Sequence, residues 1–229
     1  LAGCSSDSGS TESSASPSAE SSAAQGDGTL KIGTLLPQTG SLAFLGPPEF
    51  AGVDLAVQEI NDAGGVNDQP VESVVGDSGD TSTNIASQTV DRQLSQGVDA
   101  IIGAASSAVS LNVLDKITSA GVQQVSPANT SPEFSTYPDK GLYARTAPPD
   151  TFQGQVLGDL VAGDGNTTAA ILALDDAYGT GLADNVEKAF TAAGGTVSSK
   201  QIYDPKAASY EAEVSEAKAS NPEAVVLIG

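Results

Sequence analysis

Residues 30–65 read LKIGTLLPQTGSLAFLGPPEFAGVDLAVQEINDAGG, and this stretch decides the fold class. It opens with a short apolar run that stops at Pro37, a pattern typical of a strand. Apolar side chains then recur at three- and four-residue steps, as they do on one face of a helix. These are Phe50, Val53, Val57 and Ile60. The glycines at the end supply the left-handed backbone that closes a helix, so the stretch predicts one strand followed by one helix.

The same alternation continues to the end of the chain. Further strands are expected at 71–75, 100–103, 122–126, 168–174, 197–203 and 224–228. Helices are expected between them, at about 84–96, around Val109, Val113 and Ile117, from Asp150 through Phe152, Val156 and Leu160, around Leu182, Val186 and Phe190, and at 210–219. Strands that are apolar throughout suit a sheet covered on both faces. The alternation therefore predicts an α/β fold with parallel, doubly wound sheets.

Composition divides the chain into four segments. Residues 5–28 are almost entirely small and polar, and they hold no large apolar side chain to offset the entropy of ordering, so we expect a disordered tether there. Residues 1–4 precede this tether. Residues 29–147 are expected to form a first lobe of four strand–helix units. Residues 148–229 are expected to form part of a second lobe, because three strands are too few for a stable sheet on their own.

Charge and residue inventory exclude several classes of function. Nine Lys and Arg against 29 Asp and Glu give a formal net charge of −20, which disfavours nucleic acid as a partner. The absence of His and the single Cys exclude Cys/His zinc sites, Ser-His-Asp triads and an internal disulfide. Residues 39–46 lack the spacing of a phosphate loop, and residues 77–80 lack that of a calcium loop. We therefore expect no enzyme activity, no cofactor and no metal.

The first four residues, Leu1-Ala2-Gly3-Cys4, resemble the lipobox of bacterial lipoproteins. In that motif small residues precede a cysteine that carries a diacylglyceryl group. No apolar run in the chain approaches the roughly 18 residues needed to span a bilayer. The resemblance therefore implies an extracytoplasmic protein held at the cell membrane only by a lipid on Cys4.

The ordered part of the chain resembles a known family over residues 31–229. The matching residues are Ile32-Gly33, Pro37, Thr39-Gly40, Ala43, Gly46, Gly52, Ala56, Ile60-Asn61, Gly64-Gly65-Val66, Ile102-Gly103, Ser106-Ser107, the segment from Ser126 to Pro132, and the segment from Asp175 to Gly181. This string is similar to that of the type I periplasmic binding proteins, which serve ABC importers for leucine, isoleucine and valine, and of their relatives for amides and urea.

The resemblance implies two doubly wound lobes joined by three crossings, with a ligand trapped in the cleft between them. It assigns ligand contacts in the first lobe to Ser107, with Ser106 beside it, and to Ala128 and Thr130. In the second lobe it assigns the aromatic contact to Tyr178. Leu45 stands where relatives often carry an aromatic residue, which changes the pocket's shape. Further contacts in the family lie beyond the strand at 224–228, so the resemblance implies a chain shortened at its C-terminal end.

The residue types fit these roles on chemical grounds. Ser107 follows a strand and starts a helix, where unpaired N–H groups favour an anion such as an α-carboxylate. The Ala128 carbonyl and the Thr130 hydroxyl can accept hydrogen bonds from an ammonium group. The alternatives are structural: an N-cap at Ser107, a turn at Ala128 and Thr130, and core packing at Tyr178. Two further residues, Asp150 and Gln153, are interpreted as cap and surface residues.

The sequence thus predicts a solute-binding protein that delivers a small amino acid-like ligand to an ABC permease. Branched-chain amino acids are the first candidates, and amides or urea the second. A ligand-sensing receptor of the same fold is the alternative, and an enzyme on a Rossmann-like scaffold is disfavoured by the missing His and phosphate loop. For a chain ending at Gly229 we expect weak binding and low solubility, because each sheet would keep an open edge.

Overall fold

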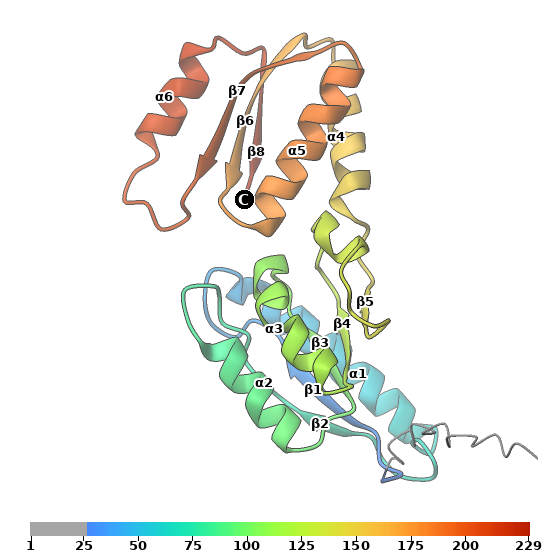
Figure 1. Ribbon diagram of the computed structural model, residues 1–229. Helices are drawn as coiled ribbons and strands as arrows, with labels where there is room; N and C mark the ends of the chain where they lie inside the picture. The colour runs from blue at the N-terminus through green and yellow to red at the C-terminus, as the bar shows by residue number, and fades with distance from the viewer. Residues whose placement is uncertain (1–26) are drawn as a thin grey trace, which may run out of the picture.

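The computed structural model describes residues 27–229, which form two parallel sheets with helices packed against them (Figure 1). Cys4 and nearly all of the predicted tether lie outside the described residues. We call the part built on the sheet nearer the N-terminus the first lobe and the remainder the second lobe. Within residues 27–229, no helix combines the length and the apolar character that crossing a bilayer requires.

The first lobe has a five-stranded parallel sheet in the order β2-β1-β3-β4-β5. Its strands are β1 (Lys31–Leu35), β2 (Glu72–Val74), β3 (Ala100–Gly103), β4 (Gln123–Ser126) and β5 (Tyr143–Arg145). Its helices are η1 (Ala43–Leu45), α1 (Gly46–Asp62), α2 (Ile85–Ser95), α3 (Ser107–Ser119) and η2 (Pro132–Ser135). The predicted α/β class is confirmed, but the prediction of four strands was wrong, because β5 pairs with β4 as a fifth.

The core of the first lobe is apolar and lies between the sheet and helices α2 and α3. Leu35 and Ile101 come from neighbouring strands, and Val90, Val113 and Ile117 come from the two helices; all are almost completely buried. Together with the pairing of β1 with β3 and of β3 with β4, this packing fixes the carboxyl ends of the three strands relative to one another. The loops that leave those ends are consequently held at one edge of the sheet.

The second lobe has a three-stranded parallel sheet in the order β7-β6-β8. Its strands are β6 (Thr168–Leu174), β7 (Thr196–Tyr203) and β8 (Ala224–Ile228), and its helices are α4 (Asp150–Gly163), α5 (Ala177–Ala192) and α6 (Glu211–Ala219). Helices α4 and α5 lie on one side of the sheet and α6 lies on the other (Figure 1). The edge strand β8 leaves Val225 and Leu227 exposed, at 59% and 71%.

Helix α4 packs through the opposite face from the one its apolar residues suggest. Phe152, Val156 and Leu160 mark the helix as predicted, yet each is more than half exposed. The buried face instead carries Gly154 and Gly158, which lie directly against α5. Glycine allows the two helix backbones to approach closely, and this contact outweighs the burial of the larger side chains.

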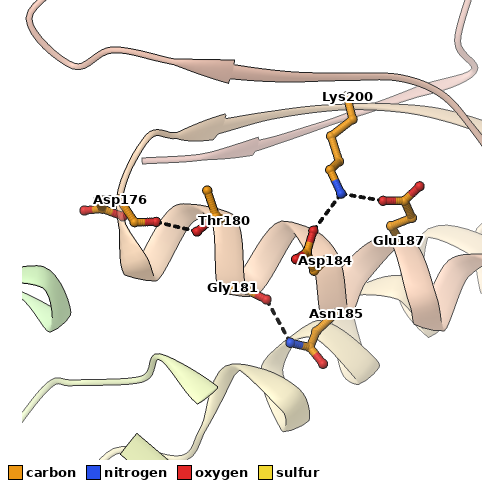
Figure 2. Close-up of polar contacts among 7 residues, drawn as sticks. All are labelled: Asp176, Thr180, Gly181, Asp184, Asn185, Glu187 and Lys200. Atoms are coloured by element: carbon orange, nitrogen blue, oxygen red, sulfur yellow. Dashed lines mark hydrogen bonds and ion pairs between the residues drawn. The ribbon is translucent and has the colours of Figure 1, made fainter. Parts of the chain in front are cut away.

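A charged contact joins the outer strand of the second lobe to α5. The ammonium group of Lys200, on β7, lies 2.7 Å from a carboxylate oxygen of Asp184 and 2.6 Å from one of Glu187 (Figure 2). Both acids belong to the helix that also carries Tyr178 at its start. Since all three side chains reach solvent, the contact contributes only modestly to stability, while it links β7 directly to α5.

Candidate ligand-binding cleft

A cleft of about 900 Å³ lies between the two lobes. Its lining residues follow the carboxyl ends of β1, β3 and β4 in the first lobe and of β6 and β7 in the second. Parallel α/β sheets bind ligands at this edge, because the loops there diverge and helix N-termini point toward the opening. All six residues assigned from the sequence line this one cavity: Leu45, Ser106, Ser107, Ala128, Thr130 and Tyr178.

Ser107 joins two segments of the first-lobe wall. Its hydroxyl oxygen accepts hydrogen bonds from the backbone N–H groups of Thr130 and Ser131, both at 3.2 Å, and the residue is 3% exposed. The structural alternative of an N-cap falls on its neighbour, because Ser106 is the N-cap of α3 and accepts from the N–H of Val109 at 3.4 Å. Ser107 therefore positions the loop after β4 against the start of α3.

Two buried polar residues that the sequence reasoning missed shape the same loop. The Ser126 hydroxyl donates to the Ala104 carbonyl at 2.7 Å and accepts from the N–H groups of Ala128 and Asn129. The Asn129 amide donates to the carbonyls of Ala104 and Ala105 at 3.0 and 2.9 Å. Both side chains are fully buried, so this network fixes the Ala128 carbonyl and the Thr130 side chain at the cleft.

The rim of the first lobe is held by two aspartates. The Asp77 carboxylate accepts from the N–H groups of Gln38 and Gly79, at 2.9 and 2.8 Å, and from the Thr39 hydroxyl at 2.6 Å. Although burial opposes ionisation, these hydrogen bonds lower the pKa of Asp77. Asp80 accepts from the N–H of Ser82 at 2.8 Å and lines the cleft. The acidic stretch at 77–80 thus organises the loop leading to Leu45.

Tyr178 lies at the first turn of α5, on the second-lobe side of the cleft. The helix is capped by Asp176, whose carboxylate accepts from the N–H of Gly179 at 2.7 Å. Figure 2 shows the Thr180 hydroxyl donating to the Asp176 backbone carbonyl, at 2.7 Å. Burial raises the pKa of Tyr178, and the negative charges of Asp150 and Asp176 raise it further, so the ring presents a neutral phenol.

Asp150 is neither the cap nor the surface residue that the sequence suggested. It is 0% exposed, occupies the first turn of α4, and its backbone N–H donates to the Thr130 carbonyl at 2.8 Å. Pro149 takes the N-cap position instead. Burial raises the pKa of Asp150 to about 6, while Thr130 and Arg145 partly counteract this and Asp176 adds to it. Gln153, by contrast, is exposed as expected and lines the cleft.

The described lining residues include no His, Cys, Lys or Arg. The described part of the cleft therefore lacks the imidazole, thiol and amine groups that commonly serve as bases or nucleophiles. What it offers is a set of hydroxyls and a carbonyl on one wall and aromatic rings on the other. Such an arrangement can hold a small polar molecule with an apolar body by hydrogen bonds and ring contacts.

Comparison with known proteins gives consistent results. The family described as "Periplasmic binding protein" matches residues 29–229. A leucine-, isoleucine-, valine-, threonine- and alanine-binding protein of Pseudomonas aeruginosa is 32% identical over 168 residues, which cover 72% of this chain and 44% of that protein. The chain spans about half the length of the curated relatives it matches.

Solved structures show the same relationship. A leucine-binding protein from Thermotoga maritima superposes with a TM-score of 0.78 at 26% identity, over 87% of this chain and 56% of that one. A branched-chain amino acid transporter substrate-binding protein from Streptococcus pneumoniae, in complex with isoleucine, gives a TM-score of 0.73 at 28% identity, over 88% of this chain and 57% of that one. The chain therefore belongs to the periplasmic binding protein family, whose members bind solutes and are not enzymes.

Proposed function

We propose that the protein captures a small amino acid-like ligand outside the cytoplasm and delivers it to an ABC importer. The observation that carries the proposal is the cleft, which takes Ser107, Ala128 and Thr130 from one lobe and Tyr178 from the other. A ligand that touches both walls binds the closed arrangement better than the open one. Ligand binding would therefore shift the population toward closure, and the closed form would be the one that a permease recognises.

The ligand class follows from the groups on the two walls. The start of α3 at Ser107 suits an α-carboxylate, and the Ala128 carbonyl and Thr130 hydroxyl suit an α-ammonium. Leu42, Phe44 and Leu45 line the same cavity and would contact an apolar side chain. Branched-chain amino acids are the first class to test, as several relatives carry their names. Polar amides are the second.

We further propose that a lipid on Cys4 holds the protein at the membrane. The cysteine follows small residues and precedes a long stretch of small and polar residues, which suits an anchor and a spacer. Metabolic labelling of the full-length protein with a fatty-acid probe would test this. Labelling that survives the Cys4→Ser substitution would contradict the assignment.

The Ser107→Ala substitution is expected to weaken ligand binding by roughly 1–3 kcal/mol, about 5- to 150-fold in affinity. It removes a hydroxyl facing the ligand's charged end and leaves the N–H groups of Thr130 and Ser131 without their acceptor. Titration calorimetry of the full-length protein, with the ligand found by a thermal-shift screen of amino acids, amides and urea, measures the change.

The matched control is Ser119→Ala, at the exposed far end of the same helix. It is expected to leave affinity unchanged. Thr130→Ala should weaken binding in the same range as Ser107→Ala. Equal affinities for the wild type and both cleft variants would contradict the proposed site, and the absence of any ligand in the screen would contradict the proposed function.

A further inference from the structure

Acidic side chains line the cleft without any basic partner among the described lining residues. Four acids take part: Asp80, Asp175, Asp176 and Glu213. Two of them are already engaged in local hydrogen bonds, Asp80 with Ser82 and Asp176 with Gly179. Asp175 is exposed to solvent. Glu213 differs from these three, because its Oε2 atom is shielded from solvent and has no hydrogen-bond partner within residues 27–229.

The second-lobe wall that carries Glu213 also carries three tyrosines and several apolar residues. Tyr203 and Tyr210 line the cleft with Tyr178, and the first two pack edge to face with ring centroids 5.3 Å apart. Their hydroxyls are occupied, since Tyr203 donates to the Ile228 carbonyl at 2.9 Å and Tyr210 to the Pro205 carbonyl at 3.0 Å. The phenol hydroxyls of Tyr203 and Tyr210 thus donate within the protein, which leaves the rings of these residues to contact a ligand.

A carboxylate with one shielded, unpartnered oxygen, on the same wall as aromatic rings, is suited to a positive charge. Ring faces attract ammonium groups through their quadrupole, and a carboxylate in a partly dry site gains a strong charge-assisted hydrogen bond from one. An aliphatic side chain in the same place would leave the Glu213 oxygen desolvated and unpaired, which is unfavourable. The composition of this wall therefore disfavours a purely aliphatic end on the ligand.

We propose that Glu213, with the rings of Tyr203 and Tyr210, makes the second-lobe wall of the cleft a site for a cationic nitrogen at the distal end of the ligand. The inference rests on the proposed capture of an amino acid-like ligand, and within that class it favours side chains with a distal nitrogen over the branched aliphatic side chains that the relatives' names suggest. The first-lobe wall holds the α-carboxylate and α-ammonium, and Glu213 selects ligands whose side chain ends in an ammonium or similar N–H donor.

Ornithine and norleucine provide a direct test, because they have the same shape and differ only by a terminal ammonium in place of a methyl group. Titration calorimetry on the full-length protein should show ornithine binding at least about tenfold tighter than norleucine, the difference expected for one charge-assisted hydrogen bond. Glu213→Gln, which keeps the side chain's shape, should lower that preference about tenfold. Glu216→Gln, on the exposed face of the same helix, should leave it unchanged.

Each outcome separates this inference from the proposed function. Equal affinities, or a preference for norleucine, would overturn the role of Glu213 and leave amino acid capture standing. A preference for ornithine that persists in Glu213→Gln would also overturn it. Putrescine, which has ammonium groups but no carboxylate, is the third test ligand. Stabilisation by putrescine without binding of any amino acid would contradict capture of a zwitterion while supporting the cationic site, and binding of none of these compounds would overturn both.

Discussion

The Gly158→Val substitution is expected to destabilise the second lobe by about 3 kcal/mol or more. A Cβ at position 158 would lie 2.6 Å from the Cβ of Ala189 and 2.8 Å from the backbone nitrogen of Phe190. Both contacts are with rigid parts of α5, so relief requires α4 and α5 to move apart. Separation would open the core around Phe190, which is 1% exposed, and would affect the lobe that carries Tyr178.

The same helix offers a control. At Gly163, the last residue of α4, an added Cβ would meet nothing within 4 Å. Gly163→Ala should therefore be neutral or stabilise by up to about 1 kcal/mol, through the better helix propensity of alanine. Urea unfolding followed by circular dichroism measures both variants. An unfolding midpoint for Gly158→Val equal to that of the wild type would show that the helices are less closely packed than described.

The strand–helix order could be predicted from the sequence because it depends on local apolar runs. The strand at 168–174 was predicted with its observed bounds, since it is apolar throughout and bounded by polar turns. The strand at 143–145 was missed, as three residues of mixed polarity carry no periodic signal. Its pairing depends on β4 lying beside it, through the register of Gln124 with Tyr143. Such a strand is defined by its neighbour and not by its own sequence.

The cleft residues and the buried helix faces differed in how far the sequence could predict them. Ser107, Ala128, Thr130 and Tyr178 were assigned through the resemblance of their motifs to a known family, and their positions agree with parallel strands that bring their carboxyl ends to one edge. The buried faces were harder to predict. An apolar stripe on α4 normally indicates the buried face, whereas glycine carries no hydropathy signal. The four-residue spacing of Gly154 and Gly158 was the available sign of a close helix contact.

Asp150 is expected to make the protein's stability depend on pH, in the opposite sense to an ordinary surface carboxylate. Its side chain is fully buried, and neither carboxyl oxygen has a hydrogen-bond partner of good geometry within the described chain. The charged and titratable groups nearby are Arg145, Asp176 and Tyr178. Arg145 is also committed elsewhere, donating to the Ser131 carbonyl at 2.7 Å and to the Ser135 hydroxyl at 2.8 Å. The folded state therefore holds the Asp150 proton more tightly than the unfolded chain does.

The direction of the effect follows from the two pKa values. The pKa of Asp150 is about 6 in the folded state, against an ordinary value of 3.8. Between these values the folded protein retains a proton that the unfolded chain has released. The raised pKa of Asp150 therefore adds about 2–3 kcal/mol to the free energy of unfolding below about pH 4. This stabilisation is lost as the pH rises through 6.

The Asp150→Asn substitution isolates this contribution, because asparagine resembles the protonated carboxyl group at every pH. The variant and the wild type should have similar unfolding free energies at pH 4, and the variant should be more stable by about 2–3 kcal/mol at pH 7.5. Asp164→Asn, at the exposed end of the same helix, should track the wild type at both pH values. Urea titrations at the two pH values give the comparison. If Arg145 fully neutralised Asp150, the difference between Asp150→Asn and the wild type would not grow with pH, and the folded-state pKa of Asp150 would have to lie near its ordinary value of 3.8.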